Sequence, residues 1–247
     1  MSFLPYLYFP WGLLLQGLAV VHFIRKRPDG FWLWIIILGG WLGALVYLIV
    51  EALPDLQAGD SIFKSISRRP RIGQLEAEVR LNPSAGNYEE LGDLYFQNHN
   101  YAKSRECYNR AIAARADSID AFYRRALCAL EMGDYAAAVP DLERVVAKEP
   151  SYDLHRAPAL LAFAYAQTGQ ADKAAPLYAR VVELSTLTET QYHYAEFLLQ
   201  QGRRQEANEW ARRILSKKDL MPRFQKRQDR PWFRKTAALL RQMQTAG

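Results

Sequence analysis

A period of about 34 residues runs through the chain from Ala85 onward, and it limits the possible fold more than any other feature of the sequence. Equivalent positions carry the same kinds of side chain in four successive units, over 85–118, 119–152, 155–188 and 188–221. Periods of this size are typical of solenoids, in which each unit buries its apolar face against its neighbours. The repeat predicts an all-α solenoid of about four helix-turn-helix units.

Small residues recur where the two helices of each unit must touch. In the four units, the small residues of the first helix and their partners in the second helix are Gly92 with Ser104, Ala126 with Ala138, Ala162 with Ala174, and Ala195 with Ala207. Without bulky side chains at these points, two antiparallel helices can approach closely. Gly133, Gly169 and Gly202 mark the turns between helices in three units, and residues 98–100 serve in the first.

The segments on either side of the repeats have simpler expected roles. Residues 53–71 read as a linker, and residues 72–84 as the second helix of a degenerate leading unit. Within the basic segment 222–247, Phe233, Ala237 and Leu240 fall on one face of a predicted helix. A solenoid needs a polar outer face at its end, so this segment is expected to be a capping helix and tail.

These repeats resemble the tetratricopeptide repeat (TPR). The resemblance is specific in the first two units, where Pro150 also supplies the closing proline, and weaker in the last two. Those two units lack the usual aromatic residue at repeat position 4. The resemblance implies that the first helix of each unit lines a concave groove that binds another protein.

Carried onto this chain, the groove positions of the family supply a set of aromatic, apolar and mildly acidic residues. They are Glu89, Asp93, Phe96, Gln97, Tyr123, Leu127, Leu130, Glu131, Phe163, Gln167, Tyr192, Glu196 and Leu199. Such a surface suits a peptide or helix with apolar anchors and some basic residues. The alternative is that some of these rings only pack between units. The Lys and Asn clamp that some members use for acidic chaperone tails is missing.

The first 52 residues have a different composition. Residues 6–24 and 31–50 are apolar stretches of 19 and 20 residues, joined by the basic turn 25–30. About 20 residues in a helix cross the hydrocarbon core of a bilayer. The sequence therefore predicts a two-helix transmembrane anchor over 1–52, with a lipid bilayer as one of the protein's partners.

Three residues are expected to pack this hairpin. Gly39 and Gly43 would let the first span approach the second, with oligomerisation as the alternative, and Gln16 would bond across the pair. The basic turn favours a cytoplasmic loop. These features predict a multi-pass protein of the bacterial inner membrane, with its repeat domain on the periplasmic side.

The run 31–50 has a Trp-rich start, a central Leu-Gly and a Leu-Val-Tyr before its end. With the basic turn and first span it resembles the N-terminal membrane segment of cardiolipin synthases and related phospholipase D-type proteins. The catalytic signature of that family, His-x-Lys-x-x-x-x-Asp, has no copy here: His22, His99, His155 and His193 all lack a lysine two positions later. The resemblance implies the anchor without the enzyme.

Charge and cysteine content add little. Residues 203–241 hold thirteen Lys or Arg and four carboxylates, a local net charge of +9. This reads as a solvated solenoid end or as a contact for an acidic partner or anionic lipid through Arg212, Arg213, Lys217 and Lys218; no nucleic acid is expected. Cys107 and Cys128 lack metal-type spacing and are expected to be buried free thiols, with the redox compartment left open.

No catalytic motif accompanies these features, so neither an enzymatic activity nor a cofactor is predicted. The leading hypothesis is a membrane-anchored scaffold that binds a peptide or helix of another protein in the concave groove. The alternative is a non-catalytic accessory subunit of phospholipid or cell-envelope synthesis, which rests on the resemblance of the N-terminal segment.

Overall fold

The computed structural model of the chain describes residues 10–26, 30–52, 70–115 and 117–245. The chain divides into two compact units, residues 1–73 and 74–247. Every regular element among the described residues is helical.

The first unit contains α1 (Pro10–Lys26), α2 (Phe31–Leu38), α3 (Gly40–Tyr47) and the π-helical turn η2 (Leu48–Ala52). Its core is small and consists of Ala19, Ile36, Ala44 and Tyr47. The Tyr47 hydroxyl lies 3.0 Å from His22 Nδ1, so the polar end of this buried ring has a partner on α1. Much of the outer surface is apolar, including Leu14, Trp34 and Leu38.

The predicted single helix over 31–50 is broken at Gly39 and Gly40. Gly40 has φ +58°, a left-handed conformation that costs glycine least, and the chain turns there so that α3 packs on α2. A Cβ atom at Gly43 would lie 1.9 Å from the Ile35 carbonyl oxygen, so only glycine permits this approach. Gln16 Nε2 donates to the Ile36 carbonyl at 3.1 Å, across from α1 to α2.

The prediction of two membrane spans, and with it a multi-pass location in the bacterial inner membrane and a periplasmic repeat domain, is wrong. Among the described residues no helix has both the length and the apolar character needed to cross a bilayer. The 17 residues of α1 extend about 26 Å at 1.5 Å per residue, and the hydrocarbon core is about 30 Å thick. Helices α2 and α3 have only eight residues each. Residues 6–9 and 27–29 of the predicted spans and turn, and the predicted linker up to 69, lie outside the described residues.

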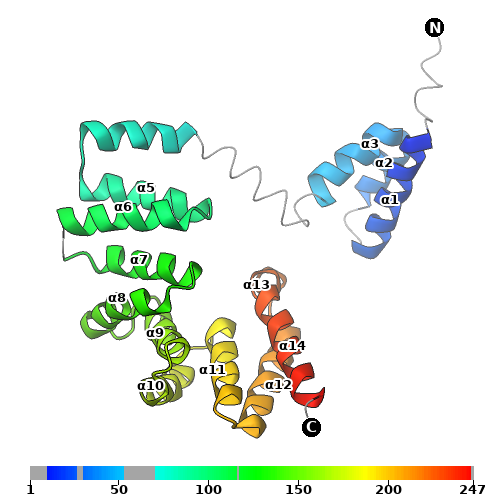
Figure 1. Cartoon of the computed structure of the whole chain (residues 1–247). Coiled ribbons are helices and arrows are strands. Elements are labelled where there is room, and N and C mark those ends of the chain that lie inside the picture. Colours follow the sequence, from blue (N-terminus) through cyan, green and yellow to red (C-terminus); the bar gives the residue numbers. More distant parts are fainter. Residues whose placement is uncertain (1–9, 27–29, 53–69, 116, 246–247) are drawn as a thin grey trace. The chain divides into compact units, whose positions relative to one another are not determined.

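The second unit is a stack of helix pairs (Figure 1). It begins within a helix over 70–81 and continues with the pairs α5 (Ala85–Gln97) and α6 (Tyr101–Ala114), α7 (Ile119–Glu131) and α8 (Tyr135–Lys148), α9 (Arg156–Gln167) and α10 (Ala171–Leu184), and α11 (Thr188–Gln200) and α12 (Arg204–Leu220). Each predicted repeat unit contains one of these pairs. The chain then ends with α13 (Arg223–Gln228) and α14 (Arg230–Thr245).

The helices begin and end where the local sequence favours it. Ser84, Asn100, Ser118 and Asp134 each accept a hydrogen bond from a backbone N–H in the first turn of the helix that follows, as N-caps do. The turn between the two helices of each unit contains one left-handed residue. These residues are His99, Gly133, Gly169 and Gly202, with φ of 58°, 73°, 76° and 76°, which agrees with the predicted turns.

The small residues lie where the helices touch, as predicted. Ala126, Ala138, Ala162 and Ala174 have no exposed surface, and the same holds for Ala195 and Ala207. In the first unit Ser104 Oγ donates to the Gly92 carbonyl at 2.8 Å, which requires close contact between α5 and α6. Larger side chains fill the space beside these contacts, so the core continues from α7 to α14.

Gly92→Ala should lower the free energy of unfolding by about 1–2 kcal/mol, because overpacking outweighs the better helix propensity of alanine. The new Cβ would lie 3.0 Å from the Tyr108 ring. That ring is buried, and its hydroxyl donates to Asp93 at 2.6 Å, so the ring cannot withdraw easily. Chemical denaturation followed by circular dichroism measures the change.

Gly86→Ala is the matched control in the same helix, because a Cβ there would meet nothing within 4 Å. It should leave stability unchanged or raise it by up to about 1 kcal/mol. Equal effects of the two substitutions would contradict close packing at Gly92.

The junction between α8 and α9 is longer than the others. Its linker spans 149–155, whereas 115–118 joins α6 to α7 and 185–187 joins α10 to α11. Asp153, Leu154 and His155 all have positive φ, at 50°, 52° and 67°. Left-handed non-glycine residues cost roughly 1–2 kcal/mol each, so this backbone needs support from its surroundings.

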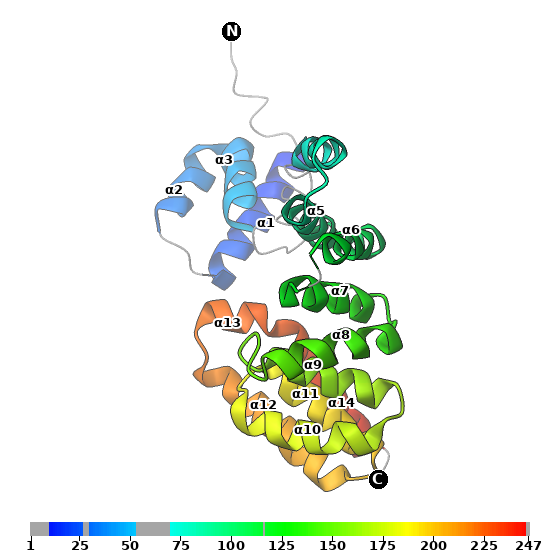
Figure 2. The same cartoon turned by 90° about the vertical axis from the view of Figure 1, so that its left-hand side faces the viewer.

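Helix α14 lies in the segment for which a capping helix is predicted. Phe233, Leu239 and Met243 are buried, and α14 packs against α11 and α12 (Figure 2). The outer face carries Arg234 and Lys235, both exposed. The short helix α13 lies before it and was not predicted from the sequence.

Candidate functional site

The thirteen predicted groove residues all lie on the first helices of the repeats, α5, α7, α9 and α11, but differ in burial. Exposed residues are Gln97, Glu131 and Gln167; half-buried residues are Glu89, Asp93, Phe96, Leu130, Phe163, Glu196 and Leu199; buried residues are Tyr123, Leu127 and Tyr192. The most accessible positions are at the ends of the helices. The buried rings also contribute to packing.

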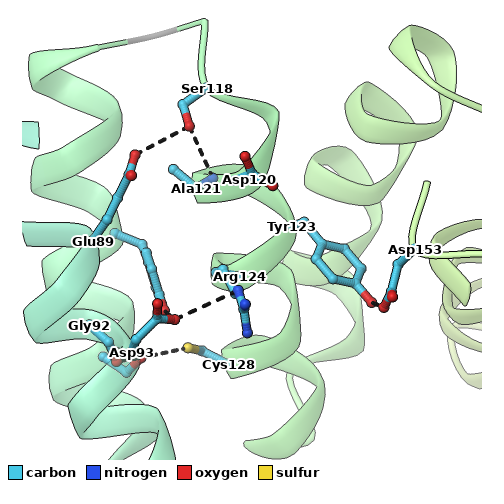
Figure 3. Close-up of polar contacts among 12 residues, drawn as sticks. Glu89, Gly92, Asp93, Ser118, Asp120, Ala121, Tyr123, Arg124, Cys128 and Asp153 are labelled. Atoms are coloured by element: carbon cyan, nitrogen blue, oxygen red, sulfur yellow. Dashed lines mark hydrogen bonds and ion pairs between the residues drawn. The ribbon is translucent and has the colours of Figure 1, made fainter. Parts of the chain in front are cut away.

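Asp93, which is one of these residues, and two neighbouring aspartates accept hydrogen bonds from tyrosine hydroxyls. Tyr108 donates to Asp93 at 2.6 Å, Tyr123 donates to Asp153, and Tyr152 donates to Asp120 (Figure 3 shows Tyr123 and Asp153). Burial, above all, raises the pKa of all three phenols, so they stay neutral near neutral pH. These bonds therefore orient the three carboxylates.

Arginines lie close to two carboxylates of the groove, Glu89 and Asp93. Arg115 lies 3.0 Å from Glu89, which also accepts from Ser118 Oγ at 3.2 Å. Arg124 Nε is 3.6 Å from Asp93, a distance beyond ordinary hydrogen bonding (Figure 3).

Arg156 bonds Glu189 at 2.8 Å and lies 3.7 Å from Asp153. This pairing ties the α8–α9 linker to α11. Burial alone would lower the pKa of Arg156, but the hydrogen bond and the charge of Glu189 together raise it, so Arg156 stays charged.

A cavity of about 330 Å³ opens between α7 and the α8–α9 linker. It is lined by Tyr123, Arg124, Leu127, Tyr152, Asp153 and Arg156. The rings of Tyr123 and Tyr152 meet edge to face, with centroids 4.9 Å apart. This cavity brings together two predicted groove residues, Tyr123 and Leu127, and four side chains that the sequence analysis missed.

Three of the missed residues come from the longer junction at the start of α9. Its presence was visible as a spacing of 36 residues between Gly133 and Gly169, two more than the repeat period. The spacing does not reveal where Tyr152, Asp153 and Arg156 point, because that depends on the left-handed backbone.

At the other end of the groove, α14 covers the residues of the fourth unit. The Tyr192 ring lies 5.7 Å from Trp232, and its hydroxyl donates to Glu196 at 3.0 Å. His193, another residue missed from the sequence, packs between Phe163 and Trp232 at 4.0 and 5.1 Å. Bonding to His193, and then to Tyr192, lowers the pKa of Glu196.

The four basic residues predicted to contact anionic lipid do not behave alike. Arg212, Arg213 and Lys218 are exposed, and Arg213 lies over the Trp210 ring at 4.9 Å. Lys217 is half-buried and donates to the Thr186 carbonyl and to Gln191 Oε1, at 3.0 and 2.8 Å. Burial, and then repulsion by Arg213, lowers the pKa of Lys217. Neither the described structure nor the comparisons support a lipid contact.

Cys107 and Cys128 are free and buried, as predicted. Cys128 Sγ donates to Ser104 Oγ at 3.1 Å, and burial raises the pKa of both thiols to about 11. At neutral pH they are thiols rather than reactive thiolates. In the described part of the chain no three His, Cys, Asp or Glu side chains gather as metal ligands would.

Comparison with known proteins agrees with the repeat fold. Residues 91–162 match the family model of the tetratricopeptide repeat. A crystal structure of MamA has 18% sequence identity and a TM-score of 0.54, and the match covers 63% of this chain and 94% of that one. MamA 41-end from Desulfovibrio magneticus RS-1 has 20% identity and a TM-score of 0.55 over 63% of this chain and 92% of that one.

A third structure is YrrB, described as a TPR protein with an unusual peptide-binding site. It has 20% identity and a TM-score of 0.54, with 63% of this chain and 80% of that one covered. Comparison with curated proteins gives no match.

Identities this low show the fold alone. No comparison supports the resemblance of residues 31–50 to cardiolipin synthases. The family match and the solved structures together show that the chain carries an all-helical, TPR-like solenoid.

Proposed function

We propose that this protein is an interaction scaffold that binds a peptide or helix of another protein in the groove formed by α5, α7 and α9. The observation that carries the proposal is the cavity between α7 and the α8–α9 linker, where two tyrosine rings lie beside Asp153 and two arginines, Arg124 and Arg156. Solenoids present extended concave surfaces of this kind to their partners. The peptide-binding site described for YrrB, which shares the fold, supports the same use here.

The side chains of the groove favour a partner with an apolar anchor and nearby basic residues. The half-buried Tyr152 offers ring surface at little entropic cost, with the buried side chains of Tyr123 and Leu127 behind it. Tyrosine hydroxyls hold Asp93, Asp120 and Asp153 in place, and Asp93 and Asp153 also lie 3.6 and 3.7 Å from Arg124 and Arg156. Complementary charge would fix the register of the partner and speed its association.

The chain as a whole fits a non-catalytic role, in line with the TPR-like fold. A membrane-anchored version of the scaffold has no support, because none of the described helices is suited to a bilayer crossing. Nor does any observation favour the accessory role in phospholipid or cell-envelope synthesis. The scaffold function therefore rests on the groove alone.

Reversing two exposed carboxylates of α7, with Asp120→Lys and Glu131→Lys, should weaken partner capture about tenfold, as a loss of ~1.4 kcal/mol in binding would. The partner is first identified by cross-linking and co-purification with the full chain, and its affinity for each purified variant is then measured. Tyr123→Ala and Tyr192→Ala are less suitable, because both rings are buried and their loss would also destabilise the fold.

Asp172→Lys with Glu183→Lys is the matched control. It makes the same change in net charge at two exposed carboxylates of α10, a second helix outside the groove. Binding should survive in this variant. Equal losses in both double variants would show that net charge, and not the groove, governs capture.

A further inference from the structure

In the first two repeat units, an arginine of the second helix lies over an aromatic ring at the fourth residue of the first helix. Arg110 Cζ is 5.9 Å from the Tyr88 ring centroid, and Arg144 Cζ is 4.1 Å from that of Phe122. A guanidinium at this distance is attracted by the electron-rich face of the ring. In the first unit this pair lines a cavity of about 300 Å³ at the junction with the preceding helix over 70–81.

The third unit keeps the arginine and lacks the ring. Thirty-six residues separate Gly133 from Gly169, and the same offset takes Phe122 to Pro158 and Arg144 to Arg180. Among the described residues no aromatic ring lies within cation–π distance of Arg180, and no carboxylate lies within ion-pair distance of it. Arg180 is exposed, whereas Pro158 is buried.

A cleft of about 530 Å³ lies where the missing ring would be. It is formed by α8, the α8–α9 linker, α9 and α10, which Figure 2 shows next to one another. Its lining includes Val146, Pro150, Pro158, Arg180, Val181 and Leu184. The floor is buried at Val181, and the wall is open at Leu184, which is 56% exposed.

This combination selects for a particular side chain. Aliphatic walls favour any apolar group, and among uncharged apolar groups a cation at the rim attracts an aromatic face most strongly. The same chain shows the arrangement twice, with Tyr88 under Arg110 and Phe122 under Arg144.

We propose that this cleft is a docking site for an aromatic side chain of a partner protein, which takes the place of the missing ring and lies against Arg180. The cleft shares no lining residue with the cavity beside α7, so this proposal does not depend on the function proposed for the groove.

N-acetyl-tryptophanamide is a suitable probe, with N-acetyl-leucinamide as the aliphatic comparison. In NMR titrations of the full chain, the tryptophan compound should shift the amide signals of Val181 and Leu184 and should bind more tightly than the leucine compound. Arg180→Gln should raise its dissociation constant about two- to fivefold, the range given by ~0.5–1 kcal/mol of cation–π attraction at an exposed site. Arg144→Gln is the control, because Arg144 already lies over the Phe122 ring of the same chain. It should leave the dissociation constant of the tryptophan compound unchanged.

Pro158→Phe restores the ring from within and gives the sharpest test. It should raise Tm by about 2–4 °C by filling the cleft, and it should abolish the probe-induced shifts at Val181 and Leu184. Leu184→Asp, at an exposed position that folding does not require, should weaken the probe at least about tenfold, as placing a charge in an apolar contact does. Unchanged shifts in either variant, or no shifts at these residues in the wild type, would overturn the proposal.

Discussion

Asp141→Ala should lower the free energy of unfolding by about 3 kcal/mol, because it leaves a guanidinium partly buried without its counter-charge. Asp141 on α8 is 6% exposed and accepts two hydrogen bonds from Arg125 on α7, at 2.7 and 2.6 Å. The same arginine donates to Asn109 Oδ1 on α6 at 2.9 Å. One side chain thus holds three helices together across the boundary of two repeat units.

The measurement is urea denaturation followed by circular dichroism, with Glu206→Ala as the matched control. Arg203 and Glu206 form an equally close pair, at 2.7 and 2.6 Å, but on the exposed surface. Solvent screens such a pair, so its loss should be hard to detect. If both variants lose a similar free energy of unfolding, burial adds nothing to the pair of Asp141 and Arg125.

Raising the pH above 10 should unfold the repeat domain cooperatively. Burial, above all, raises the pKa of Tyr95, Tyr108, Tyr123 and Tyr192, and it raises the pKa of Tyr165 to about 12. An unfolded chain releases these protons near the ordinary pKa of 10, so the folded state holds more protons between the two values. The stability that the protonated tyrosines contribute is complete below pH 10 and is lost as the pH rises toward 12.

Circular dichroism and tyrosinate absorbance, recorded in the same titration, test this expectation. Helicity should stay constant up to about pH 10 and then fall together with the appearance of tyrosinate. Gradual formation of tyrosinate with unchanged helicity would contradict it.

Two hydroxyl deletions compare a buried tyrosine hydroxyl that has no hydrogen-bond partner with one that donates a hydrogen bond. The Tyr178 hydroxyl is buried and has no hydrogen-bond partner among the described residues, so Tyr178→Phe should raise stability or leave it unchanged. Tyr108→Phe, in contrast, removes a donor to Asp93 and should lower stability.

The repeat architecture could be predicted from the sequence because short-range rules fix it. Gly133, Gly169 and Gly202 supply left-handed turns, and the fully buried alanines at the helix contacts allow the two helices of a unit to approach closely. These effects act within a single unit and recur in the next, so the sequence shows each of them several times.

The N-terminal unit could not be predicted in this way. Its apolar run reads as one helix by hydropathy, but the positive φ of Gly40 and the contact of Gly43 with the Ile35 carbonyl break it in two. A pair of glycines in an apolar segment can serve either as a helix contact or as a turn. Only tertiary packing distinguishes the two.

The candidate site was predicted in part for a related reason. Positions carried over from the repeat pattern identify Tyr123 and Leu127, whereas Tyr152 and Asp153 come from a linker that departs from the pattern and Arg156 is the first residue of α9 after it. The contact between Tyr192 and Trp232 of α14 likewise joins segments that are distant in the sequence. Neither feature leaves a periodic trace in the sequence.

The N-caps described above differ between the two halves of the array. Ser84, Asn100, Ser118 and Asp134 bond the first turns of α5 to α8, whereas α9 to α12 begin without such a bond from their N-cap side chains. Each cap favours its helix by about 1 kcal/mol before any neighbour is in place. During synthesis the N-terminal pairs leave the ribosome first, so they can form early and act as the template on which the later pairs assemble.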